Sequence, residues 1–359
     1  MFNFRFGRHL AIAEESYDFP PFRPPSEADS LLVRVTRGCP WNRCAFCPMY
    51  KHIKFEKRPI ADIKRDIDTA ATFTGGRVET VFIGDSDSLV IKTEDICEIL
   101  DYLYAAFPSV SRTTSYARAH TLKLKSIQDL RKIRKAGLTR LHIGLETGSP
   151  RLLKHIRKGA TPETMIHGCT RAKGAGFEVS VYVLLGIGGM ASWKEHATAT
   201  ARVLNEIDPD FVRVRTITPQ PGTPLFQWWT EGSFEMPDPE TILKEQKAII
   251  EGLSITCQYL SDHVSNYAPV HGNLPDDKSA MLSVIDTTLE KLSKDEDFRA
   301  RLEKMRYLRR LEINVSNITR GHPLTACCPN PFSLGLKRFL TKLRLATGDV
   351  KTRPPGSNS

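Results

Sequence analysis

A short segment near the start of the chain carries three cysteines, Cys39, Cys44 and Cys47. Glycine and proline residues around them keep this segment out of regular structure, so three thiolates can converge on one metal centre. Thiolates suit zinc or an iron–sulfur cluster. A closed structural zinc site needs four protein ligands, with His52 as a candidate fourth, whereas a [4Fe-4S] cluster held by three cysteines leaves one iron open.

The cysteines directly follow the first of six short apolar or β-branched runs. Segments with the period of helices separate these runs, so the pattern predicts repeated strand–helix units. Such units form a parallel sheet covered by helices, and six of them predict an α/β fold with an open or partial barrel. The loops that follow the strands then form the functional rim. The predicted strands cover residues 31–36, 79–83, 112–116, 140–145, 178–185 and 211–216.

Several helix boundaries are marked by specific residues. Two pairs fit the spacing of a capping box, namely Ser126 with Asp129 and Ser192 with Glu195. A capping hydroxyl stands before proline at Ser149-Pro150 and Thr161-Pro162. Helices are predicted to end at Ala136-Gly137 and Ala175-Gly176.

We call residues 36–48, which hold the three cysteines, the cysteine loop. In this loop the sequence resembles the radical S-adenosylmethionine (SAM) superfamily, in which an aromatic residue precedes the third cysteine, as Phe46 does here. The resemblance implies a [4Fe-4S] cluster with one iron on each of Cys39, Cys44 and Cys47 and the fourth iron chelated by SAM. An electron from an external donor such as flavodoxin or ferredoxin would cleave SAM, and the 5′-deoxyadenosyl radical would abstract a substrate hydrogen. Four residues separate the first two cysteines, whereas most of the superfamily has three.

The resemblance also assigns side chains to SAM at the ends of later strands. Glu146 and Lys158, twelve positions apart, match residues that contact SAM in the oxygen-independent coproporphyrinogen oxidases and the elongator-type radical SAM enzymes. Tyr182 stands where the family commonly has Asp. The remaining candidates are Gly84, Asp85 and Ser86 after the second strand, and Ser115 and Arg118 at the third.

The resemblance spans roughly residues 31–226 and implies a partial (β/α)6 barrel of the radical SAM type with a helical C-terminal extension. Its last match is the segment from Pro219 to Leu225, similar to a Pro-Gly-Thr-Pro-Leu segment of these enzymes. We expect an irregular loop over 217–238, a helix over 239–256, an irregular stretch over 261–276 and two helices over 277–311. The predicted domains are an irregular N-terminal extension (1–30), the barrel (31–226), substrate-covering loops and helices (227–313) and a basic irregular tail (314–359).

Composition limits the remaining choices. The 359 residues are 40% hydrophobic and 26% charged, which excludes a disulfide-stabilised miniprotein and a fully disordered or collagen-like chain. With neither a membrane-spanning apolar run nor a secretory signal in the sequence, we expect a cytoplasmic protein. The leading hypothesis is a radical SAM enzyme acting on a small or medium-sized metabolite. RNA or tRNA modification is the alternative, since the basic tail and the arginine-rich helix over 299–310 could meet RNA phosphates and the net charge is +10. A non-catalytic zinc-binding module is the rival from another class.

Overall fold

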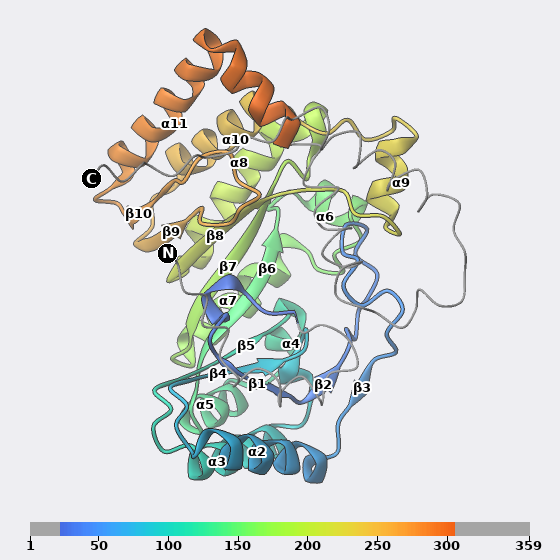
Figure 1. Ribbon diagram of the computed structural model, residues 1–359, viewed down its shortest axis with the longest axis vertical. Helices are drawn as coiled ribbons and strands as arrows, with labels where there is room; N and C mark the ends of the chain where they lie inside the picture. The colour runs from blue at the N-terminus through green and yellow to red at the C-terminus, as the bar shows by residue number, and fades with distance from the viewer. Residues whose placement is uncertain (1–21, 306–359) are drawn as a thin grey trace, which may run out of the picture. The chain divides into compact units, whose positions relative to one another are not determined.

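The computed structural model describes residues 22–305, which are built around an eight-stranded sheet (Figure 1). The strand order is β1-β4-β5-β6-β7-β8-β9-β10, with parallel pairing from β1 to β9 and an antiparallel β10 at one edge. The strands are β1 (Leu31–Arg34), β4 (Thr80–Gly84), β5 (Arg112–Tyr116), β6 (Leu138–Glu146), β7 (Glu178–Leu185), β8 (Phe211–Thr216), β9 (Cys257–Leu260) and β10 (His271–Leu274). All six predicted strands are confirmed, and β9 and β10 extend the sheet beyond them.

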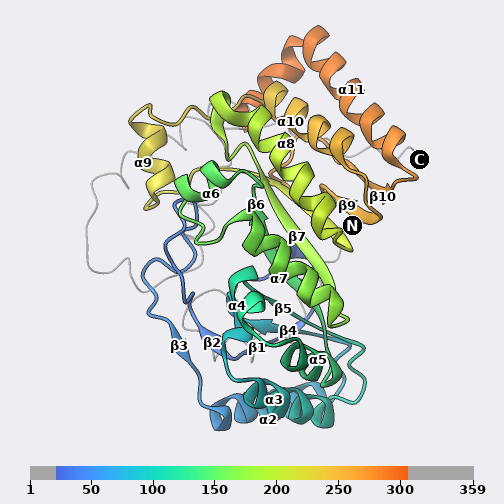
Figure 2. The same cartoon turned by 180° about the vertical axis from the view of Figure 1, so that it is seen from behind.

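Helices follow most strands, as the strand–helix pattern predicts (Figures 1 and 2). They are α2 (Ile60–Thr74), α3 (Thr93–Ala106), α4 (Ala119–Leu124), α5 (Ile127–Lys135), α6 (Pro150–His155), α7 (Pro162–Gly174), α8 (Gly189–Ile207), α9 (Pro224–Thr230), α10 (Pro239–Gly252) and α11 (Lys278–Lys294). Short 3-10 turns lie at η1 (Pro25–Glu27) and η2 (Ser88–Val90), and β2 (Thr36–Arg37) pairs with β3 (Glu56–Lys57). None of the described helices is long and apolar enough to cross a bilayer.

The two faces of the sheet differ in chemistry because side chains alternate along each strand. One face carries apolar residues such as Val81, Ile143 and Val181, which join the main core with residues of the covering helices. We call the opposite face the inner face. Its rings touch in series across four strands, in the order Phe82, Tyr116, His142 and Tyr182.

Most of the predicted helix signals are confirmed, and one is wrong. The side chains of Ser126, Ser149 and Thr161 each accept a hydrogen bond from the amide three residues later. Positive φ angles at Gly137 and Gly176 follow the ends of α5 and α7. The capping box at Ser192 and Glu195 does not form, because α8 begins earlier, at Gly189, and the Glu195 carboxylate binds Arg151 and Ser149 instead.

Beyond β8 the structure is more regular than the sequence suggests. The expected loop over 217–238 contains α9, which Thr223 caps by accepting from the Phe226 amide. Helix α10 ends at Gly252 rather than at residue 256, and β10 lies inside the expected irregular stretch. The expected helix pair begins with α11, and residues 296–305 are helical. Cys327, Cys328 and the predicted basic tail lie outside the described residues.

Candidate functional site

The start of the cysteine loop is bonded to the end of β4. The Gly38 amide donates to the Asp85 carboxylate at 2.9 Å, and the Ser86 hydroxyl donates to the Gly38 carbonyl at 2.9 Å. Gly38 has φ of +81°, a backbone conformation that favours glycine. Asp85 is buried and lies 3.5 Å from Arg34 Nε. The side chains of Asp85 and Ser86 therefore hold the cysteine loop. The predicted contact of this turn with SAM would be made by backbone groups of Gly84, Asp85 and Ser86.

The middle of the loop is bonded on both sides to other strand-to-helix connections. The amide of the buried Ala45 donates to the Ile156 carbonyl at the end of α6, at 2.8 Å. Its carbonyl accepts from the Leu225 amide at the start of α9, at 2.9 Å. The proline-rich segment identified in the sequence thus fixes the position of the cysteine loop.

Trp41 joins the loop to the segment after α6 and to Arg118. Its indole nitrogen donates to the Arg157 carbonyl at 2.8 Å. A Cβ atom on Gly159 would lie 2.3 Å from the Trp41 ring, so only glycine lets the two approach. The Arg118 guanidinium carbon lies 5.2 Å from the Trp41 ring centroid, a cation–π distance that places Arg118 beside the cysteine loop.

The three thiols are half-buried neighbours. The Cys47 pKa is raised to about 11, mainly by burial and also by the charges of Cys44 and Cys39, while a backbone hydrogen bond from Met49 and the charge of Lys158 oppose the rise. Burial also raises the Cys44 pKa, and the charge of Lys158 opposes that rise. Since a metal-bound thiol is deprotonated, metal binding here displaces protons, and a nearby lysine favours the resulting thiolates.

Glu146 and Lys158 meet beside these thiols. Lys158 Nζ lies 2.7 Å from Glu146 Oε1, and both side chains are largely buried. Burial lowers the Lys158 pKa, but the charges of Glu146 and Cys44 outweigh it, and the net shift is upward. Glu146 has φ of +66°, directly after a shift in the β6–β7 register that turns its side chain. A Cβ atom on Gly144 would lie 2.2 Å from Glu146 Oε1, so glycine makes room for the pair.

The two candidates at the third strand occupy different environments. The Arg118 amide donates to Asp87 at 3.1 Å, and the Thr121 hydroxyl donates to the same carboxylate at 2.6 Å. Burial raises the Asp87 pKa to about 6. Ser115 is fully buried, and its hydroxyl donates to the Ile83 carbonyl at 2.9 Å, so this hydrogen bond stays within the sheet. Asp87 belongs to the acidic turn over 84–88 that the sequence indicates after the second strand, but it was not among the predicted SAM contacts.

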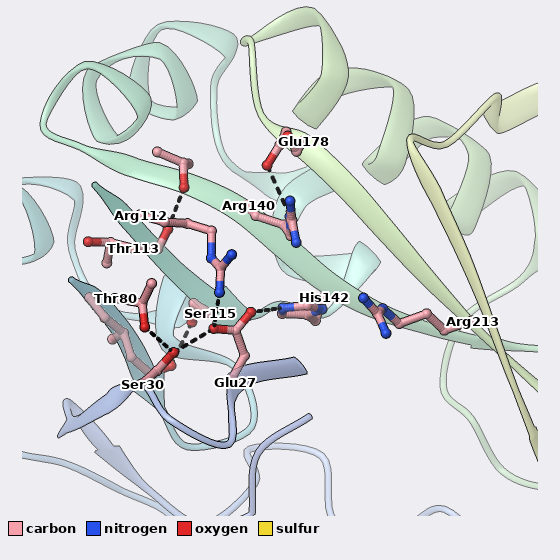
Figure 3. A network of polar contacts seen from close by, with 12 residues as sticks. Glu27, Ser30, Thr80, Arg112, Thr113, Ser115, Arg140, His142, Glu178 and Arg213 are labelled. Atoms are coloured by element: carbon pink, nitrogen blue, oxygen red, sulfur yellow. Dashed lines mark hydrogen bonds and ion pairs between the residues drawn. The ribbon is translucent and has the colours of Figure 1, made fainter. Parts of the chain in front are cut away.

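Tyr182 lies on the inner face rather than at the cysteine loop. Its ring centroid is 6.0 Å from that of His142 and 5.1 Å from the Arg215 guanidinium carbon. His142 bonds through Nε2 to Glu27 at 3.2 Å, in a polar network that also includes Arg112 (Figure 3). Sequence reasoning missed Glu27, His142 and Arg215. Alternating arginines at 213 and 215 on one strand were the available signal for a polar sheet face.

The glycine-rich turn after β7 is held by a neutral acid. The Gly186 amide donates to Glu245 Oε2 at 2.6 Å. Burial raises the Glu245 pKa to about 8 and lowers that of the neighbouring His196 to about 3. With Nε2 of His196 3.9 Å from Oε1 of Glu245, these are a carboxylic acid and a neutral imidazole at pH 7 rather than an ion pair. Helix α10 therefore fixes the turn through an uncharged contact.

The donor set fits a cluster that takes three cysteines. Three thiols share one loop that is held at its start and in its middle, and a lysine lies beside them. Within residues 22–305, no three histidine, cysteine or acidic side chains are grouped closely enough to hold a single metal ion. In an iron–sulfur cluster each thiolate binds a different iron. Cysteines that hold such a cluster therefore need not lie as close together as the ligands of a single metal ion.

Comparisons with known proteins identify a family profile, related sequences and similar structures. Residues 33–197 match the sequence profile of the radical SAM superfamily. An uncharacterized methyltransferase of Pyrococcus horikoshii is 27% identical over 219 residues, covering 59% of this chain and 45% of that protein. A tRNA-2-methylthio-N(6)-dimethylallyladenosine synthase of Chlorobium phaeobacteroides is 27% identical over 202 residues, covering 54% of this chain and 43% of that protein.

Among solved structures, coproporphyrinogen III oxidase of Escherichia coli aligns with a TM-score of 0.48 and 19% identity, covering 68% of this chain and 56% of that one. The chain thus spans about half the length of the curated relatives that it matches.

Proposed function

This chain is a radical SAM superfamily protein. We propose that it is an enzyme that cleaves SAM reductively and takes a hydrogen atom from a small or medium-sized metabolite. The superfamily uses a [4Fe-4S] cluster and SAM. When bound, these two groups supply one-electron cleavage of SAM and hydrogen abstraction from the substrate. An external donor such as flavodoxin or ferredoxin would provide the electron.

The observation that carries the proposal is the meeting of the cysteine loop with the Glu146–Lys158 pair. Cys39, Cys44 and Cys47 would hold the cluster, and no described cysteine outside the loop lies beside them to act as a fourth ligand. Lys158 can pair with the SAM carboxylate, and Glu146 can accept bonds from its ammonium or hydroxyl groups. Arg118, stacked on Trp41, adds a cation at the same place.

The chain's own groups would also keep the reacting atoms away from water. The cysteine loop is bonded to the connections after α6 and before α9, so three rim segments are joined at one point. Phe46, Trp228 and Trp229 pack against the apolar cluster that includes Ile156. The Phe46 ring centroid lies 6.0 Å from Lys158 Nζ, so this ring brings apolar surface to the Glu146–Lys158 pair. Such exclusion protects a reactive species from side reactions.

The test is anaerobic reconstitution of the full chain with iron and sulfide, followed by reduction in the presence of SAM. We expect a brown protein with about four irons per chain that forms 5′-deoxyadenosine. Cys44→Ala should lose both the iron and the product, because alanine offers no metal ligand. The matched control is Cys97→Ala, on α3 and outside the loop, which should keep both.

Two outcomes would contradict the proposal. A colourless protein that holds zinc through the same cysteines would favour a binding module without catalysis. If a cell extract stimulates SAM cleavage only before nuclease treatment, the substrate is RNA and the metabolite hypothesis is wrong.

A further inference from the structure

The inner face of the sheet is unusually polar for parallel strands. Such strands are normally buried on both faces and apolar throughout. Here the inner face carries His142 on β6, Tyr182 on β7, and Arg213 and Arg215 on β8. The Tyr116 ring, on β5, lies in contact with the His142 ring on the same face. Burying polar groups costs free energy unless they find partners, so this arrangement needs an explanation.

Arginine and lysine side chains of the sheet and its loops are mostly neutralised within the protein. Five of them have a carboxylate partner, in the pairs Arg34–Asp85, Arg112–Glu27, Arg140–Glu178, Lys158–Glu146 and Arg213–Asp262. Arg215 differs, because within residues 22–305 it forms neither a hydrogen bond nor an ion pair. It is half-buried, and its guanidinium carbon lies 5.1 Å from the Tyr182 ring centroid.

Two polar atoms on the inner face also lack partners. The Tyr182 hydroxyl is buried and has no hydrogen-bond partner in the described part of the chain. The same holds for Nδ1 of His142, whose ring contacts that of Tyr182. His142 points its other nitrogen at Glu27, and Arg213 lies nearby on the same face (Figure 3). A cation and a hydroxyl donor are therefore unsatisfied at one place.

We propose that Arg215 and Tyr182 bind a carboxylate of the substrate on the inner face, which makes the substrate of the proposed enzyme a carboxylic acid. The guanidinium fork matches a carboxylate with two parallel hydrogen bonds, and a tyrosine hydroxyl can donate a third. This inference rests on the proposed function, since it concerns the substrate of that reaction.

The charges favour a carboxylate over a phosphate group. One unpaired guanidinium neutralises a carboxylate, which carries a single negative charge. A phosphate monoester carries nearly two charges at pH 7 and would leave one of them uncompensated in a half-buried place. The phosphodiester backbone of RNA would also have to enter between buried side chains, since Arg213 is only 7% exposed.

The carboxylate of SAM has other cations closer to the cysteine loop. Lys158 and Arg118 both act on Cys44, where their charges lower a thiol pKa that burial raises. Arg215 acts instead on Tyr116 and Tyr182: burial raises the pKa of each tyrosine, and the arginine opposes the rise. Lys158 and Arg118 are therefore the cations available to the SAM carboxylate beside Cys44, and Arg215 is the cation available beside Tyr182.

The experiment measures binding of propionate, the probe carboxylate, to the anaerobic, cluster-loaded full chain with SAM present, by ligand-observed NMR. Propionamide, of the same shape but neutral, and inorganic phosphate are the comparison ligands. Arg215→Gln should weaken propionate binding about tenfold or more, and Tyr182→Phe about threefold to tenfold. Arg215→Lys keeps the charge without the fork and should fall between wild type and Arg215→Gln.

The matched control is Arg202→Gln on the exposed surface of α8, where Arg202 lies 3.9 Å from Glu206. It should bind propionate as wild type does, and propionamide should bind more weakly than propionate. Circular dichroism shows whether each variant is folded. If Arg215→Gln does not fold, the conservative Arg215→Lys and Tyr182→Phe variants still test the proposal.

The proposal is overturned if wild type does not bind propionate, or if Arg215→Gln and Arg202→Gln bind it equally. Tighter binding of phosphate, or displacement of propionate by an RNA oligonucleotide, would assign the site to a phosphorylated ligand or to RNA. An equal loss of SAM affinity in Arg215→Gln would assign it to SAM. Formation of 5′-deoxyadenosine by the same preparations tests the proposed function separately, since propionate binding does not require it.

Discussion

At the scale of single residues, the pair of Glu146 and Lys158 is the most informative feature of the chain. Its two charges lie 2.7 Å apart, largely buried, and next to the Cys44 thiol. Without a ligand the two satisfy each other. Each keeps further hydrogen-bonding capacity, since an ammonium has three donors and a carboxylate several acceptor positions. The pair is thus suited to hold a zwitterion without a net change in local charge.

Lys158→Ala should weaken SAM binding about tenfold to a hundredfold, because it removes a charge-assisted hydrogen bond and leaves Glu146 uncompensated. Equilibrium dialysis of labelled SAM against the cluster-loaded chain measures the change. Lys173→Ala, on α7, is the matched control: it too removes a partly buried lysine paired with a carboxylate, Asp208, and it should bind SAM normally. Unchanged SAM affinity in Lys158→Ala would remove this lysine from the predicted site.

Arg118, Ser115 and Tyr182 lie in three different environments. Arg118 is brought to the cysteine loop by Trp41 and Asp87. Ser115 donates its hydroxyl hydrogen to the neighbouring strand, and Tyr182 lies with Arg215 and His142. A residue type at the end of a strand indicates a possible contact, but the side-chain partners decide whether that contact is available.

At the scale of elements, the turn from β6 into α6 depends on a close approach to α8. The Gly148 amide donates to the Thr200 hydroxyl at 2.9 Å. A Cβ atom on Gly148 would lie 2.1 Å from the Ala199 carbonyl oxygen, which belongs to the backbone of α8 and cannot move aside alone. This turn carries Glu146 at one end and precedes Lys158, so its packing positions the candidate site.

Gly148→Ala should therefore destabilise the protein by about 1–3 kcal/mol, the usual cost of overpacking a core. The matched control is Gly174→Ala at the end of α7, where no atom lies within 4 Å of the added Cβ. There the substitution should be neutral or stabilise by up to about 1 kcal/mol, because alanine favours a helix. Urea denaturation followed by tryptophan fluorescence measures both. Equal stabilities of the two variants would contradict the close approach.

At the scale of the whole described chain, Glu27 joins the N-terminal segment to the sheet. It is fully buried, accepts from Ser30 and His142, and pairs with Arg112 at 3.3 Å (Figure 3). Burial raises its pKa, but the bonds from His142 and Ser30 and the charge of Arg112 outweigh that effect and lower it to about 2. The segment that sequence analysis predicted as an irregular extension therefore contributes a charged side chain to the interior.

Glu27→Gln should lower the free energy of unfolding by about 1–3 kcal/mol at pH 7, because it removes one partner of a buried charge pair. The carboxylate contributes stability above its ordinary pKa of 4.5, and this contribution is lost as the pH falls towards 2. The difference between wild type and variant should therefore shrink between pH 4.5 and pH 3 in urea denaturation. A difference that stays constant over this range would show that ionisation of Glu27 does not carry the effect.

Patterns within short stretches of sequence predicted much of the fold. All six strands, the caps at Ser126, Ser149 and Thr161, and the helix ends at Gly137 and Gly176 depend on periodicity and on residues within a few positions of one another. Strand β9 was missed because its four residues are too few to show a period. Helix α9 was missed because aromatic residues obscure its pattern, although Thr223 and Pro224 give the same start signal as the other helices.

The strand–helix order and the cysteine loop can be recognised in the sequence alone, and the likeness to the radical SAM superfamily follows from them. What the inner face of the sheet presents depends on contacts between residues far apart in the chain. Gly38 meets Asp85 across 47 positions, His142 meets Glu27 across 115, and Trp41 meets Arg157 across 116. Such pairings depend on strand register and on helices packing against the sheet, so no local pattern encodes them. For the same physical reason, an arginine left without a carboxylate can be recognised only when all its neighbours are in place.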